Sequence, residues 1–121
     1  MLLKKLGCYR ELSYGEKKDP SIREFIHSKI ENKEKLCEYL RKGRVIAACG
    51  GVVKDVICPE KGIIGSPDDM TDGTWIWSAD LVYYVEEYDL MLDSSFVSHA
   101  KNNGWNVPDN IFIDPDNIEV V

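Results

Sequence analysis

Apolar positions near the start of the chain repeat with a helical spacing. Between residues 19 and 30, large apolar side chains recur every three or four positions, which predicts an amphipathic helix. Asp19 is a residue type that caps helices, and Pro20 suits the first helical position. The side chains expected to face inward are those of Ile22, Phe25, Ile26 and Ile30.

A second helix is predicted over Lys33–Lys42 from the same spacing. Tyr39 is a further candidate for its inward face, and Gly43 stands where a left-handed residue commonly ends a helix. The core positions of this helix are Leu36, Cys37 and Leu40.

Two β-prone runs, Val45–Cys49 and Val52–Ile57, flank the pair Gly50-Gly51. This pattern predicts a β-hairpin, although a bulge in one longer strand would look similar. A second turn is expected at Asp72-Gly73, directly before a strand over residues 74–77. Side chains alternate along a strand, so the two tryptophans of this strand should share the core face and Ile76 the opposite face.

Two more helices are predicted in the second half. Ser78 is expected to cap the first, and Asp93 is expected to cap the next, which Gly104 ends. A strand is predicted around 111–113. The order of these elements favours one α+β domain over residues 1–121, with a small antiparallel sheet between the two helix pairs. The expected apolar stripes are Leu81, Tyr84, Val85 and Tyr88, and then Phe96, Val97 and Ala100.

Length and composition place the chain among ordinary globular proteins. It has 121 residues, of which 44% are hydrophobic and 30% are charged. We expect a cytoplasmic protein, because no long apolar segment indicates a signal peptide or a membrane span. The cysteines lack metal-ligand or disulfide spacing, so we expect free thiols at Cys8, Cys37, Cys49 and Cys58.

The charge is distributed unevenly along the chain. Residues 1–60 hold 13 Lys/Arg and 9 Asp/Glu, a net of +4. Residues 61–121 hold 2 Lys/Arg and 12 Asp/Glu, a net of −10, and the two halves together give the net charge of −6. A field of one sign influences the choice of partner and the rate of encounter rather than the fold.

No arrangement of residues indicates catalysis or a cofactor. Glycine motifs that bind phosphate are missing, and the Asp68 to Ala79 segment lacks the ligands of a calcium loop. We therefore expect no metal, no small-molecule cofactor and no enzymatic activity. The alternative is a small cytosolic enzyme or ligand-binding domain with a pocket near Cys49, Cys58 and His99, and a third possibility is a module that associates with itself.

The segment from Thr71 to Tyr88 resembles a motif found in small bacterial proteins. Upstream, Leu40-x-x-Gly43 and Asp55 add to the likeness, which spans residues 36–96. Proteins of this group are similar to immunity proteins of polymorphic-toxin and contact-dependent inhibition systems. The positions that carry the resemblance read Thr71-Asp72-Gly73-x-Trp75-x-Trp77-x-x-Asp80-Leu81-x-Tyr83-Tyr84-Val85-x-x-Tyr88.

The resemblance implies a cytoplasmic toxin–antitoxin role through protein–protein interaction. The partner would be a cognate toxin domain that is basic and nuclease-like. Binding to a membrane or to a nucleic acid is not expected. Carboxylates on an acidic surface would meet its cationic cleft, and aromatic side chains would supply apolar anchors. Trp77 and Tyr83 are the candidate anchors, and the candidate electrostatic residues are Asp68, Asp69, Asp72, Asp80, Glu86, Glu87 and Asp89.

Overall fold

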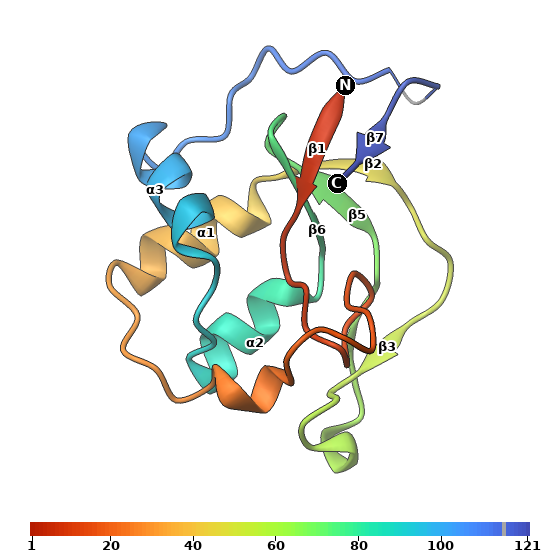
Figure 1. The fold of residues 1–121 in the computed structure, drawn as a ribbon, viewed down its shortest axis with the longest axis vertical. Helices are drawn as coiled ribbons and strands as arrows, with labels where there is room; N and C mark the ends of the chain where they lie inside the picture. Colours follow the sequence, from red (N-terminus) through yellow and green to blue (C-terminus); the bar gives the residue numbers. More distant parts are fainter. Residues whose placement is uncertain (115) are drawn as a thin grey trace.

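The computed structural model describes residues 1–114 and 116–121 and has an α+β fold (Figure 1). A five-stranded sheet has the strand order β2-β5-β6-β1-β7, and β3 and β4 form a separate pair. The three α-helices of the described residues lie together beside the larger sheet (Figure 1). The strands are β1 (Leu2–Lys5), β2 (Arg44–Ala47), β3 (Val53–Lys54), β4 (Ile63–Gly65), β5 (Asp69–Thr71), β6 (Trp75–Ser78) and β7 (Glu119–Val120), and the helices are α1 (Lys33–Arg41), α2 (Leu81–Tyr88) and α3 (Ser94–Asn102).

The larger sheet is mixed rather than antiparallel, which corrects the expected layout. Strands β2, β5 and β6 are antiparallel, whereas β1 runs parallel to both β6 and β7. The predicted turn at Asp72-Gly73 is confirmed, because it joins β5 to β6 with Thr71 opposite Ile76. Strand β1 escaped sequence reasoning because it is four residues long and half of them are lysines.

The helix predicted over residues 20–30 is wrong. Only Ile22–Glu24 is helical, as a single 3-10 turn, and Ser21 rather than Asp19 caps it. The backbone beyond this turn bonds to the end of α2 instead: the amide of His27 donates to the carbonyl of Tyr88 at 2.7 Å. His27 also takes a positive φ of 59°, which a continuing helix does not allow. Tertiary hydrogen bonds have replaced the helical ones, while the apolar stripe still packs on the core.

The hairpin predicted around Gly50-Gly51 is also wrong, and the alternative of one longer strand is not found either. Strand β2 pairs with β5, and β3 pairs with β4, so the two glycines connect two different sheets. No strand forms at 111–113. The carboxyl-terminal strand is β7, which pairs with β1 and places Leu3 opposite Val120.

The predicted helices of the middle and second half are confirmed as α1, α2 and α3, and their apolar stripes face the core. Asp93 caps α3 by accepting from the amide of Ser95 at 2.8 Å. Ser78, however, does not cap α2: its hydroxyl donates to the carboxylate of Asp80, the residue before the helix.

Four aromatic rings form the centre of the core. Phe96 of α3 meets Tyr39 of α1, Trp75 and Trp77 edge to face, at centroid distances of 5.8, 5.7 and 5.5 Å. Both tryptophans are buried as predicted, and so is Ile76 on the opposite face of β6.

Gly43 serves this core in a different way from the one predicted. Its backbone is not left-handed. Instead, a Cβ at this position would lie 2.5 Å from Cζ2 of Trp77. The indole ring is fully buried and cannot move aside, so the position requires the absence of a side chain.

We predict that Gly43→Ala lowers the free energy of unfolding by about 1–3 kcal/mol, because the added methyl group overlaps Trp77. Urea denaturation measures this loss. The matched control is Gly50→Ala, which adds a methyl group with no atom within 4 Å and without a positive φ. This control should keep or slightly raise the stability, and equal midpoints for both variants would contradict the packing argument.

Candidate functional site

Asp72 lies inside the protein rather than on its surface. Its Oδ2 accepts from the hydroxyl of Tyr39 at 2.6 Å and lies 3.4 Å from Nε2 of His99. Its Oδ1 accepts from the backbone amides of Thr74 and Trp75 at 3.0 and 2.8 Å. These bonds fix the β5–β6 turn against α1 and α3, and the carboxylate is not available to a partner.

Trp77 and Asp80 are buried too. Trp77 is 1% exposed and belongs to the aromatic core, so its ring does not form a surface anchor. Asp80 is the residue directly before α2. Burial raises the pKa of its carboxyl, although the hydrogen bond from Ser78 acts in the opposite direction. A buried acid with a raised pKa contributes little to an external field.

Asp68 and Asp69 are half-buried beside β2. The amide of Cys49 donates to Oδ1 of Asp68 at 3.0 Å, and the hydroxyl of Tyr14 donates to Asp69. Burial is the larger cause of the raised pKa of Tyr14, and the hydrogen bond to Asp69 raises it further. Both carboxylates keep part of their surface in solvent.

Tyr83 is half-buried, and its hydroxyl donates to Oδ2 of Asp55 at 2.7 Å. Asp55 itself is 1% exposed. It also accepts from the hydroxyl of Tyr88 at 2.6 Å and from the amides of Ile57 and Cys58, both at 2.8 Å. Burial acts to raise the pKa of Asp55, but the four hydrogen bonds outweigh it and the pKa is lowered. Asp55 therefore ties the 55–58 loop to α2, a role that sequence reasoning did not assign.

The carboxylates near the end of α2 are partly neutralised by the basic first half of the chain. Arg41 of α1 forms an ion pair with Glu86, and Nζ of Lys33 lies 2.6 Å from Oδ1 of Asp89. Glu87 is exposed and has no ion pair among the described residues. The three residues thus lie near one another at the surface, but only Glu87 carries an uncompensated charge.

The segment that follows α3 is acidic and contributes to the negative charge that no lysine or arginine pairs with. Residues 103–121 contain four acidic residues and no lysine or arginine. Within the described part of this segment, none of the four forms an ion pair with a lysine or arginine. They are Asp109, Asp114, Asp116 and Glu119.

Phe112 stands among these acids and is 82% exposed. Sequence reasoning missed it because the apolar triplet 111–113 reads as a strand, which would have buried one face. The signal that marks it is the series of acidic residues on both sides, which is unusual for a strand in a core.

The three residues of the alternative enzyme or ligand-binding site, Cys49, Cys58 and His99, each contact a different acidic residue. Cys49 lies beside Asp69, Cys58 beside Glu60, and His99 beside Asp72. Burial and then the nearby Asp69 raise the pKa of Cys49, and the hydrogen bond with Glu60 raises the pKa of Cys58. Raised pKa values keep both thiols protonated, which disfavours a thiolate nucleophile.

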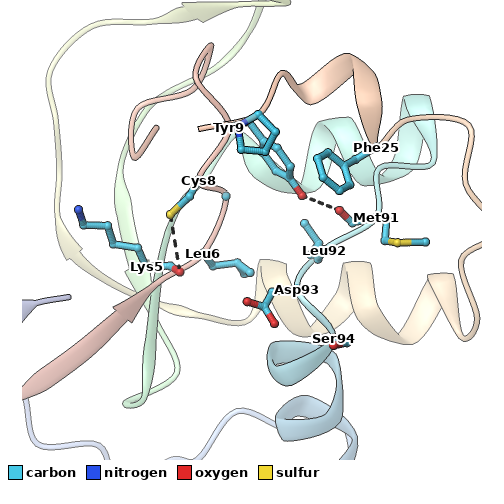
Figure 2. A pocket seen from close by; sticks show the side chains of 11 residues that line it. Lys5, Leu6, Cys8, Tyr9, Phe25, Met91, Leu92, Asp93 and Ser94 are labelled. Atoms are coloured by element: carbon cyan, nitrogen blue, oxygen red, sulfur yellow. Dashed lines mark hydrogen bonds between the residues drawn. The ribbon is translucent and has the colours of Figure 1, made fainter. Parts of the chain in front are cut away.

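A cleft of about 440 Å³ opens between the segment after β1 and the linker from α2 to α3 (Figure 2). Its walls include the rings of Tyr9 and Phe25. Its polar groups are already engaged, because the hydroxyl of Tyr9 donates to the carbonyl of Met91 at 2.5 Å and Asp93 caps α3. Burial also raises the pKa of Cys8 at its edge. The cleft offers apolar contact but few free groups for chemistry.

Two further properties bear on the site. Within residues 1–114 and 116–121, no three His, Cys, Asp or Glu side chains gather as a metal ion would require. None of the helices in this part of the chain combines the length and the apolar character needed to cross a membrane. Comparison with known proteins adds nothing: no family model, no curated protein and no solved structure matches the chain.

We predict that Asp55→Asn lowers the free energy of unfolding at pH 7 by about 2–3 kcal/mol, because one amide oxygen cannot accept all four donors. The pKa of Asp55 is lowered in the folded state relative to about 3.9 in the unfolded chain. The stabilisation is therefore present above about pH 4 and is lost as the pH falls through the lowered value.

Urea unfolding at a series of pH values between about 2 and 7 tests this prediction. The difference between the protein and Asp55→Asn should shrink as the pH falls. Asp109→Asn, at an exposed carboxyl group, is the control and should follow the unmodified protein throughout. A constant difference at all pH values would show that the ionised carboxylate is not responsible.

Proposed function

We propose that this protein binds a basic toxin domain and neutralises it, as an immunity protein does. The observation that carries the proposal is the negative charge that folding leaves uncompensated. Of the acidic second half, Asp72 and Asp80 are buried, and Glu86 and Asp89 have internal cationic partners. The carboxylates of residues 103–121 form no ion pair with a lysine or arginine among the described residues.

Uncompensated charge of one sign favours an oppositely charged partner. It raises the local concentration of cationic molecules and increases the rate of productive encounter by about 10- to 1000-fold at low ionic strength. It also disfavours nucleic acids, whose phosphates carry the same sign. A basic enzyme with a phosphate-binding cleft is the complementary partner, and occupying that cleft would block its substrate.

The acidic groups should not contribute equally. Glu86 and Asp89 are already paired at the surface with Arg41 and Lys33. A partner that used these two carboxylates would have to displace those internal cations, so the net gain would be small. Glu87 and the residues of the 103–121 segment need no such exchange, and we expect them to dominate the electrostatic part of the interaction.

We expect cells that produce a toxin domain encoded next to this protein to survive when the protein is produced with it. The candidate domain is the variable C-terminal region of a large secreted protein encoded immediately upstream. Survival should require a one-to-one complex, measurable with purified proteins. Because the attraction is screened by salt, the association rate should fall at least about tenfold between about 0.05 and 0.5 M salt.

Removing a free carboxylate can be compared with removing a whole ion pair. Glu87→Gln should slow association, whereas the double variant Glu86→Gln with Arg41→Gln should change the association rate little, since this pair carries no net charge. Growth arrest that persists although both proteins are soluble would contradict the proposed function. An association rate that is insensitive to salt would contradict its electrostatic basis.

A further inference from the structure

Phe112 is the most exposed of the large hydrophobic side chains among the described residues, at 82%. The next most exposed large hydrophobic side chains are those of Val121, Val52 and Ile63, at 62%, 61% and 61%. Burying a phenylalanine side chain that is otherwise in water is favourable by about 1.5–3 kcal/mol. A phenyl ring in this position therefore has much to gain from a partner.

The backbone before Phe112 is held by hydrogen bonds from β2. Nη1 of Arg44 donates to the carbonyl of Ile111 at 2.7 Å, and Nη2 donates to the carbonyl of Asp109 at 3.2 Å. The side chain of Ile111 packs onto Gly73 at the β5–β6 turn, where a Cβ would lie 3.3 Å from Cγ1 of Ile111. Ile111 is thus turned toward the sheet while its neighbour Phe112 is turned to solvent.

The backbone after Phe112 is held by Asp114. Its Oδ1 accepts from the amide of Asp116 at 3.0 Å, and its Oδ2 accepts from Nδ2 of Asn117 at 2.7 Å. The bond from Asn117 and then the bond from Asp116 lower the pKa of Asp114. The ring therefore lies between a backbone stretch held to β2 by Arg44 and a local turn closed by Asp114, and both reduce the freedom that a partner would have to restrict.

The charges around the ring select the partner. Asp109, Asp114 and Asp116 all lie within four positions of Phe112 in the sequence. Two cations border the same segment, because Arg44 donates to the carbonyls of Ile111 and Asp109 and the amino group of Met1 donates to the carbonyl of Asn117. With three aspartates against these two cations, the segment keeps a net negative charge. An apolar ring in such a segment fits a surface where lysines or arginines border an apolar recess.

We propose that Phe112, with the carboxylates of Asp109, Asp114 and Asp116 in the same segment, is the anchor by which this protein docks on a cationic protein that offers an apolar recess for the ring. The proposal rests on the proposed function and replaces Trp77 and Tyr83 as the anchor residues. The acids around Phe112 steer the encounter, and insertion of the ring slows dissociation.

Binding of Phe112→Ala to the toxin domain that the protein neutralises in the growth assay tests the proposal. We expect the dissociation constant to rise at least about tenfold, mainly through faster dissociation, as for a truncated anchor residue. The matched control is Ile63→Ala on β4, which removes an exposed side chain elsewhere and should leave binding unchanged. Both variants should unfold at the same urea concentration as the unmodified protein.

The double variant Asp109→Asn with Asp116→Asn tests the electrostatic part and leaves the Asp114 turn intact. It should slow association and flatten the salt dependence. If the toxin is neutralised and Phe112→Ala binds as tightly as the unmodified protein, this inference fails and the proposed function stands. If no neighbouring toxin domain is neutralised, the proposed function fails and this inference fails with it.

A third result would assign the ring to a second copy of the chain, for example to the apolar cleft beside Tyr9 and Phe25 (Figure 2). Sedimentation would then depend on protein concentration, and Phe112→Ala would abolish that dependence. Such a result would overturn the proposed cationic partner.

Discussion

The carboxylate of Asp72 is buried, and the groups that surround it come from three separate elements. The turn before β6 supplies two amides, α1 supplies the hydroxyl of Tyr39, and α3 supplies His99. A buried carboxylate is tolerated only when such groups replace the water it has lost. The arrangement of both helices relative to the sheet is therefore coupled to one side chain. Asn103, which donates to the hydroxyl of Tyr39 at 3.2 Å, extends the network to the end of α3.

This use of carboxylates explains why the acidity of the second half does not translate directly into an acidic surface. Asp55 and Asp72 act as hydrogen-bond acceptors inside the protein, and Asp80 is buried with a raised pKa. Two more acids are paired with α1. Of the acids that remain exposed, Glu87 and Asp93 precede α3, and Asp109, Asp116 and Glu119 follow it. Net charge in a sequence therefore overestimates the external field wherever acids also organise turns and loops.

The parts of the fold that depend on local sequence were predictable. The spacing of apolar residues identified α1, α2 and α3, and the Asp-Gly pair identified the turn before β6. The errors arose where tertiary contacts overrode local preference. His27 bonds to the end of α2 instead of continuing a helix, and β2 pairs with the distant β5. Of the predicted site residues, Trp77 lies on the core face that the alternation along its strand predicts, and Phe96 of α3 packs against its ring, so it is not a surface anchor.

The position of β7 bears on the candidate anchor. Because this strand pairs with β1, the chain must pass from the end of α3 to the far edge of the sheet (Figure 1). Residues 103–118 cover that path, and their described part contains no helix or strand. Segments longer than about 12–15 residues without regular structure are uncommon in compact domains, and many of them bind ligands or partners. This segment packs Ile111 on Gly73 and leaves Phe112 in solvent, so the apolar character of position 112 is not explained by packing within the protein.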